Sequence, residues 1–235
     1  MELPFFLSIL ALQHQNNLDN KLHSKLTTNI ANETMQLLSE KAIYMPDHDM
    51  LIVSDLHFGK IEHFRKNGIG LPVNAARKDI NKLEKLIKAI NAKDIVFLGD
   101  LFHSDYNNAW PAFKEMLSQF PNKIFHLILG NHDILDESLY NGMELTFKME
   151  ISNLTLTHEP MDVITEGKYN ICGHIHPGVK LRGKGKQTLR IPCFYFGQHT
   201  GILPSFGTFT GTHVIKPVEG DRIFVVKDDV VLEVN

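Results

Sequence analysis

Short apolar runs recur along the chain from residue 42 onward. Five of them are rich in β-branched or large apolar residues and are too short for a helix, namely residues 51–53, 95–98, 124–129, 154–156 and 169–172. Runs of this length without polar alternation are typical of strands that are buried on both faces of a sheet. The pattern therefore predicts five buried strands.

Segments with a helical period lie between these runs. From Pro72 to Lys93 the apolar residues recur every three to four positions, which predicts an amphipathic helix that Pro72 opens. A second helix is predicted near Pro111, and a short third one after Asp133. The second helix is expected to bury Trp110, Phe113, Leu117 and Phe120. Strands that alternate with helices predict a layered α/β domain with right-handed crossovers.

The residue patterns at the two ends of the chain differ from the alternation of strands and helices between them. After Gly183 the turn-forming stretches 219–221 and 227–229 separate β-rich runs, which predicts an antiparallel addition at the C-terminus. At the other end, residues 1–32 are expected to be a weakly ordered extension, because residues 13–32 are rich in Asn and Gln. Residues 33–235 are expected to form a single domain.

Composition excludes several classes of protein. The apolar stretch 3–12 is shorter than the roughly 20 residues that span a bilayer, and no Lys or Arg precedes it, so we expect neither a membrane anchor nor a secretory signal. A net charge of −3 gives no strong overall attraction to nucleic acid. Cys172 and Cys193 form no disulfide framework and no zinc motif, and we expect neither to be a nucleophile. A cytoplasmic protein is the simplest interpretation.

Each of the five predicted strands is followed by polar side chains with ligand chemistry. These are Asp55 and His57, Asp100, Asn131 with His132 and Asp133, His158, and His174 with His176. The carboxyl ends of strands in α/β sheets converge, and such an edge is the usual place for a site. Because side chains alternate along a strand, each D-x-H or H-x-H pair is expected to project to one side. Buried carboxylates and imidazoles need partners or metal, and mixed N/O ligation suits Mn²⁺, Fe or Zn²⁺.

These blocks resemble the calcineurin-like metallophosphoesterase superfamily, whose pattern is D-x-H, GD, GNH[DE], H and GH-x-H in that order. The resemblance implies a sandwich of two mixed β-sheets flanked by helices, and two divalent ions, with Mn²⁺ preferred and Fe, Zn²⁺ or Mg²⁺ as alternatives. The first ion would take Asp55, His57 and His176, and the second would take Asn131, His158 and His174. Asp100 would bridge them, and the ions would clamp a phosphate and activate a water for in-line attack.

The same resemblance assigns two residues to catalysis rather than to ligation. His132 would lie over the scissile phosphate, where it stabilises charge or protonates the leaving oxygen. Asp133 would hold the orientation of the His132 imidazole. A fortuitous set of structural polar residues is the alternative, but five blocks in order, each after a predicted strand, argue against it.

The residues around the blocks resemble a narrower group, the PdeM-like phosphoesterases of bacteria. The matching stretches are residues 55–60, 99–104, 158–160, 173–177, 191–194 and 203–207. This group is assigned as DNA-repair endonucleases because its members accompany a repair ligase, a helicase and an exonuclease. The resemblance implies a phosphodiester substrate in DNA, and those proteins as partners.

A basic stretch follows the last block. It holds Lys180, Arg182, Lys184, Lys186 and Arg190, which could hold backbone phosphates of a substrate or could simply form a solvated hairpin. Two other functions stay open at this point. One is a phosphodiesterase or phosphatase for a nucleotide or another small phosphoester, and the other is a non-catalytic, metal-containing scaffold for repair partners.

Overall fold

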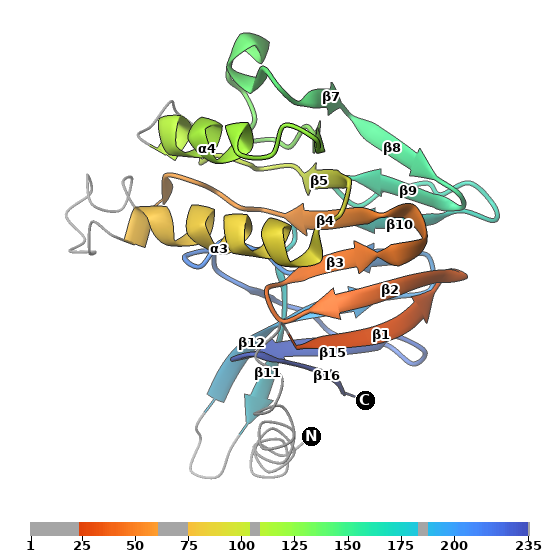
Figure 1. Cartoon of the computed structure of the whole chain (residues 1–235). Coiled ribbons are helices and arrows are strands. Elements are labelled where there is room, and N and C mark those ends of the chain that lie inside the picture. Colours follow the sequence, from red (N-terminus) through yellow and green to blue (C-terminus); the bar gives the residue numbers. More distant parts are fainter. Residues whose placement is uncertain (1–23, 61–74, 104–108, 183–187, 235) are drawn as a thin grey trace.

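The computed structural model describes residues 24–60, 75–103, 109–182 and 188–234 of the 235-residue chain. Within these residues the chain forms two mixed β-sheets stacked face to face, with two helices on the outer face of one sheet (Figure 1). None of the described helices is both long and apolar enough to cross a bilayer.

The first sheet has seven strands in the described residues, and their spatial order follows the sequence from β1 to β7. Strands β1 to β4 are antiparallel neighbours, whereas β4 to β7 are parallel to one another. The parallel strands therefore bring their carboxyl ends to one edge. The strands are β1 (Lys25–Ile30), β2 (Glu33–Leu38), β3 (Ala42–Met45), β4 (Met50–Ser54), β5 (Asp94–Leu98), β6 (Ile124–Ile128) and β7 (Glu144–Thr146).

The second sheet has the order β14-β11-β12-β13-β10-β9-β8, and β15 and β16 extend it from β12. Strand β10 is parallel to both β9 and β13, so the carboxyl ends of β9 and β10 also lie together. The strands are β8 (Lys148–Ile151), β9 (Leu154–Thr157), β10 (Tyr169–Cys172), β11 (Pro177–Arg182), β12 (Thr188–Phe196), β13 (Thr200–Ile202), β14 (His213–Val214), β15 (Arg222–Lys227) and β16 (Val230–Val234).

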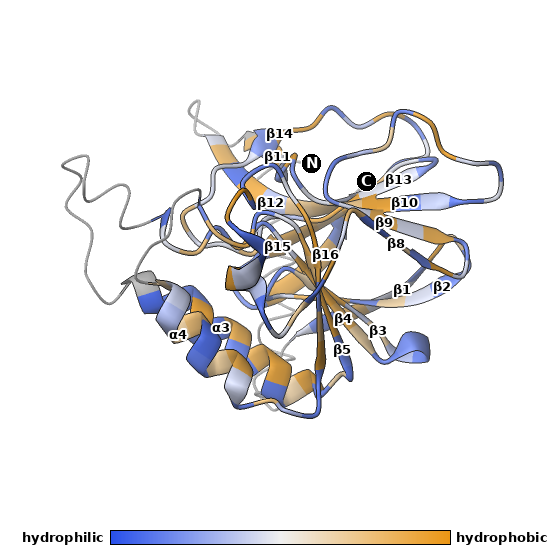
Figure 2. Cartoon of the chain, turned by 90° about the horizontal axis from the view of Figure 1, so that it is seen from above, coloured by the Kyte–Doolittle hydropathy of each residue, from blue (hydrophilic) through white to orange (hydrophobic). Residues whose placement is uncertain are grey.

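Two layers of buried side chains hold these parts together. Helices α3 (Ala75–Ile90) and α4 (Ala109–Ser118) pack their apolar sides against the first sheet, as the colouring in Figure 2 shows for both helices. A second cluster lies between the sheets and includes Ile52, Val96, Ile171 and Phe224. Strands β4, β5 and β6 are thus covered on both faces, which explains their nearly continuous apolar sequences.

The predicted elements agree with the observed ones in type and differ at their bounds. All five predicted strands are present, and α4 begins two residues before Pro111. The third helix is a short 3₁₀ turn, Glu137–Tyr140, and a second such turn spans Pro46–His48. The extension expected over residues 1–32 includes β1, so the sheet begins before residue 33, whereas residues 1–23 lie outside the described residues. The C-terminal antiparallel addition is the β15–β16 hairpin.

Candidate metal centre

The predicted ligands all lie just beyond the carboxyl ends of their strands. Five of them have left-handed backbone conformations: Asp55, His57, Asp100, His174 and His176 have φ values between 46° and 63°. Such a conformation costs about 1–3 kcal/mol in a residue other than glycine, and it persists where the surroundings fix it. The sequence predicted that the pairs Asp55/His57 and His174/His176 converge because side chains alternate along a strand. This explanation is wrong, because these residues do not have extended backbone. They converge because the chain turns sharply after the strand.

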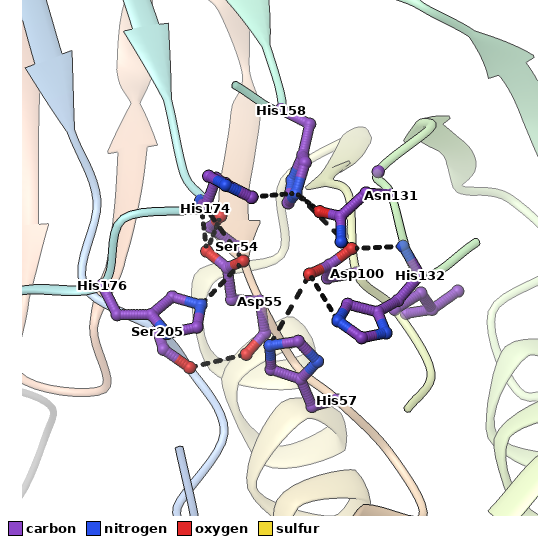
Figure 3. A network of polar contacts seen from close by, with 12 residues as sticks. Ser54, Asp55, His57, Asp100, Asn131, His132, His158, His174, His176 and Ser205 are labelled. Atoms are coloured by element: carbon purple, nitrogen blue, oxygen red, sulfur yellow. Dashed lines mark hydrogen bonds and ion pairs between the residues drawn. The ribbon is translucent and has the colours of Figure 1, made fainter. Parts of the chain in front are cut away.

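His158 is the centre of one group of donor atoms. Its Nδ1 lies 2.8 Å from the carbonyl oxygen of Leu98, which can only accept a hydrogen bond, so Nδ1 carries the proton and Nε2 has a lone pair. This Nε2 lies 3.2 Å from His174 Nδ1, 3.1 Å from Asn131 Oδ1 and 3.4 Å from Asp100 Oδ1 (Figure 3). Nitrogen and oxygen atoms that can ligate a metal thus face one another at close range, an arrangement that a bound cation stabilises.

A second group forms around Asp55, His57 and His176, whose ligand atoms lie within 4.8 Å of one another. His176 Nε2 is 3.0 Å from Asp55 Oδ1. Burial lowers the pKa of His57 to about 3, so its imidazole is neutral and has a lone pair to offer. Neither ring nitrogen of His57 has a hydrogen-bond partner in the described part of the chain, although the side chain is buried. An orphaned buried imidazole of this kind fits a metal ligand.

The charge of Asp55 is set by its partners. Burial alone would raise the pKa of this carboxyl group, but the hydrogen bond and the charge of His176 outweigh burial and lower the pKa below its usual value. Oδ2 also accepts a hydrogen bond from Ser54 Oγ at 2.5 Å and one from the backbone N–H of His174 at 3.0 Å. Asp55 is therefore held as a carboxylate in a fixed orientation.

Asp100 lies between the two groups. Its Oδ2 is 3.7 Å from His57 Nε2, and its Oδ1 is 3.4 Å from His158 Nε2. One carboxylate that faces both groups is the arrangement expected of a ligand that bridges two cations. The residues present thus fit two divalent ions, with N and O ligands and no thiolate.

Glycines in the motifs permit this close approach. A Cβ on Gly173 would lie 1.8 Å from Ser54 Oγ and 2.6 Å from Asp55 Oδ2. A Cβ on Gly99, whose φ is +69°, would lie 2.3 Å from His158 Nδ1. The glycine of each block therefore makes room for the ligand of another block.

His132 stands at the open side of the centre. Its side chain is 35% exposed, against 3–4% for His57, Asp100 and His158. Its Nε2 lies 4.0 Å from Asp100 Oδ2, and its backbone N–H donates to Asp100 Oδ1. A substrate that reaches the centre from solvent would therefore meet His132.

Asp133 does not orient the His132 imidazole, and this expectation is corrected. Its carboxylate accepts hydrogen bonds from the backbone N–H groups of Asp100, Leu101 and Gly130, at 2.8, 3.0 and 2.9 Å. Burial raises the pKa of Asp133 to about 6, and the negative charge of the neighbouring Asp100 carboxylate also raises it. Asp133 thus ties the GNHD loop to the backbone around Asp100, which makes it a positioning residue.

Comparison with known proteins identifies this arrangement. The profile of the calcineurin-like phosphoesterase family matches residues 49–207, more than half of the chain, and these residues contain every predicted metal ligand. The chain belongs to the calcineurin-like phosphoesterase family. Family membership implies that divalent metals serve a hydrolase acting on phosphoesters, and the two donor groups fit that requirement. No curated protein matches the chain significantly.

Two solved structures are similar to this chain to different degrees. The crystal structure of Pseudomonas putida nuclease MPE is 24% identical, covers 90% of this chain and 100% of its own, and superposes with a TM-score of 0.74. A protein of unknown function from Aquifex aeolicus is also 24% identical but covers 54% of this chain and 78% of its own, with a TM-score of 0.40. The first likeness supports the two-sheet phosphoesterase architecture.

The described part of the basic stretch lies on the paired strands β11 and β12. Lys180 on β11 and Arg190 on β12 are opposite one another across the two strands and are both exposed. Arg182 is two residues beyond Lys180 on the same strand, and Lys184 and Lys186 lie outside the described residues. Strand β11 begins directly after His176, and Lys180 follows four residues after that ligand.

Thiol chemistry has no support in the structure. Both cysteines are buried, and burial raises the pKa of Cys193 to about 12. The pKa of Cys172 is also raised, by burial and by the charge of Asp55. A thiol with a raised pKa is a poor nucleophile near neutral pH.

Two residues at the centre had no clear signal in the sequence. Ser205 donates its hydroxyl to the backbone carbonyl oxygen of Asp55 at 2.7 Å, although 150 positions separate the two residues. The ring centroid of His103 lies 5.5 Å from that of His132 and 6.0 Å from that of His57. Both residues lie in stretches that match the PdeM-like group, 99–104 and 203–207, but that match assigned neither of them a role at the centre.

Proposed function

We propose that this calcineurin-like phosphoesterase is a two-metal phosphodiesterase that cleaves phosphodiester bonds in DNA. The observation that carries the proposal is the convergence of the potential ligand atoms His158 Nε2, His174 Nδ1, Asn131 Oδ1 and Asp100 Oδ1, beside the group of Asp55, His57 and His176. Such a set fits two divalent cations, and Asp100 faces both groups. When bound, the cations supply charge stabilisation to the phosphoryl oxygens and activate the attacking water.

The residues of this chain would divide the remaining work. The seven ligands hold the reacting groups, and their fixed backbone limits reorganisation during the reaction. His132 would place its Nε2 near the leaving oxygen and donate a proton to it, because this is the exposed imidazole at the mouth of the centre. Asp133 would keep the GNHD loop and Asp100 at a fixed separation through its three backbone hydrogen bonds.

Three features support DNA as the substrate. The exposed pair of Lys180 and Arg190 could bind phosphates that lie beside the scissile one. The structural neighbour from Pseudomonas putida carries the name of a nuclease. The motif surroundings resemble the PdeM-like group, which implies a role in bacterial DNA repair beside a ligase, a helicase and an exonuclease, in the cytoplasm and with Mn²⁺ as the preferred ion.

A first experiment tests the reaction class with the full chain stripped of metal. Mn²⁺, Mg²⁺, Zn²⁺ or Ca²⁺ is added back, and hydrolysis of bis-p-nitrophenyl phosphate and p-nitrophenyl phosphate is followed. We expect cleavage of the diester with Mn²⁺. Asp100→Ala should lose both metal and activity, whereas His132→Ala should retain metal and lose about 10²- to 10⁴-fold in turnover. Unchanged turnover in His132→Ala would overturn its assigned role.

A second experiment tests the substrate. The Mn²⁺-loaded protein is incubated with single-stranded, nicked and branched DNA, and with small phosphoesters such as cyclic nucleotides. Cleavage of DNA is the expected result. Efficient hydrolysis of a small phosphoester with intact DNA would instead support a small-molecule phosphodiesterase. Loss of every activity despite measured metal occupancy would support the scaffold function.

A further inference from the structure

A short segment after β13, residues 203–208, runs from the second sheet to the first and passes under the metal centre. We call it the strap. It begins with the Leu203 N–H, which donates to the carbonyl oxygen of Cys172 at 2.8 Å. The strap is buried up to Gly207 and reaches Thr208 at the surface. No metal ligand was predicted in it, and no ligand atom of either donor group comes from it.

The strap makes three hydrogen bonds to the end of β4. The Ser205 hydroxyl and the Gly207 N–H both donate to the Asp55 carbonyl oxygen, at 2.7 and 3.2 Å. The Phe206 N–H donates to the Ser54 carbonyl oxygen at 2.8 Å. Figure 3 shows the Ser205 contact below Asp55. The bond to the Ser54 carbonyl holds the peptide plane before Asp55, and the two bonds to the Asp55 carbonyl hold the plane after it. Together they fix the left-handed conformation of Asp55, whose φ is +53°.

Helix α3 anchors the strap from the other side. The Asp79 carboxylate accepts hydrogen bonds from the backbone N–H and the hydroxyl of Thr208. Lys82 donates to the Phe206 carbonyl oxygen at 3.2 Å and lies 3.8 Å above the Phe206 ring. Asp79 is buried, with 8% exposure, so its hydrogen bonds are shielded from water. The chain of contacts thus runs from α3 through the strap to the backbone of a metal ligand.

We propose that Asp79 and Ser205 are positioning residues of the metal centre, which act through the strap to hold Asp55 in its strained, ligating conformation. Without the strap, Asp55 would relax toward an extended backbone, and its carboxylate would turn away from His57 and His176. This inference rests on the proposed function only in requiring that the centre binds divalent metal. Neither residue touches a reacting atom.

The test measures Mn²⁺ affinity, which does not depend on activity. Isothermal titration of the metal-free full chain compares Ser205→Ala, Asp79→Asn and Thr208→Val with the unmodified protein. We expect each to bind Mn²⁺ more weakly, by about 10- to 100-fold, the range typical of residues that orient metal ligands. Thr208→Ser retains the hydroxyl that donates a hydrogen bond to Asp79, so this variant should bind Mn²⁺ as tightly as the unmodified protein.

Matched controls separate this role from a general loss of stability. Ser118→Ala removes a surface hydroxyl that bonds to the Glu115 carbonyl oxygen, and Glu84→Gln neutralises a carboxylate on α3 that pairs with Lys88. Both should leave Mn²⁺ affinity unchanged. Thr208 is exposed, so Thr208→Val should fold even if Ser205→Ala does not. Its metal-free melting temperature is recorded to establish this.

The outcomes are distinguishable. If Thr208→Val and Asp79→Asn fold and bind Mn²⁺ as tightly as Glu84→Gln, the positioning role is wrong while the metal centre stands. If the unmodified protein itself binds no divalent cation, the proposed function fails, and this inference fails with it. Weaker binding in both variants, with recovery in Thr208→Ser, establishes the role.

Discussion

At the scale of single residues, burial decides which groups carry charge. Lys82 is the clearest case outside the metal centre, because burial lowers the pKa of its amino group to about 7. The neighbouring charge of Lys41 acts in the same direction, whereas the carboxylates of Asp79 and Glu40 oppose it, and Lys78 adds a smaller lowering effect. As pH rises, the folded protein therefore releases this proton well below the pH of about 10.5 at which an unfolded chain does.

This shift predicts how stability depends on pH. Between about pH 7 and pH 10 the unfolded chain binds the Lys82 proton and the folded chain does not, so the free energy of unfolding should rise with pH in that window. Urea unfolding of the metal-free protein at several pH values measures this rise. Lys82→Met lacks the group and should show a flatter profile. Parallel profiles for the two proteins would contradict the shifted pKa.

At the scale of elements, the β11–β12 hairpin joins the metal centre to an exposed basic surface. Lys180 and Arg190 lie opposite one another on the hairpin, so their charges add on one face. The strand that carries Lys180 starts where the ligand His176 ends. A long polyanion bound at the centre would therefore extend along this face, whereas a small ester would not reach it.

The hairpin predicts a difference between substrates. Lys180→Ala/Arg190→Ala should raise KM for single-stranded DNA and reduce the slope of log affinity against log salt by about 1.4, because two phosphate contacts are lost. Hydrolysis of the aryl diester should not change. Lys85→Ala/Lys114→Ala removes the same charge from exposed positions on α3 and α4 and is the control. Equal effects of both double variants on DNA cleavage would show that only net charge matters.

At the scale of the whole molecule, the metal centre joins the two sheets. Asp55, Asp100 and Asn131 follow strands of the first sheet, whereas His158 and His174 follow strands of the second. Cations bound between these residues would link the two sheets and would offset the electrostatic repulsion between the buried carboxylates of Asp55 and Asp100. Because metal binds the assembled centre and not the separated strands, binding stabilises the folded state.

Metal should therefore raise the melting temperature of the protein. At a Mn²⁺ concentration of about 100 times Kd, linkage predicts about 2.7 kcal/mol of stabilisation, or a shift of about 5–10 °C for a domain of this size. Differential scanning calorimetry with and without Mn²⁺ measures the shift. Asp100→Ala should show little change. A melting temperature that is independent of Mn²⁺ in the unmodified protein would argue against metal between the sheets.

The sequence by itself determined the buried strands and the amphipathic helix, and it predicted the seven candidate ligands. Strands such as Ile95–Leu98 are marked by continuous apolar residues, and the ligands follow them directly, so local pattern and strand order suffice. Strands β1, β2, β3, β7 and β8 were not predicted. Of these, β1, β7 and β8 are edge strands of their sheets, and half-exposed edge strands carry a weak hydrophobic signal. The residue pattern alone does not show to which sheet such a strand belongs.

Only the tertiary structure decided how the polar side chains are used. Asp133 is three residues from Gly130 but bonds to the backbone of Asp100, and Ser205 reaches Asp55 across 150 positions. The ligand pairs converge through left-handed backbone rather than through strand alternation. Hydrogen bonds between distant segments depend on how the two sheets stack, and that packing is a property of the whole core. The sequence therefore identifies the chemistry of the site, whereas the fold decides which residues hold it in place.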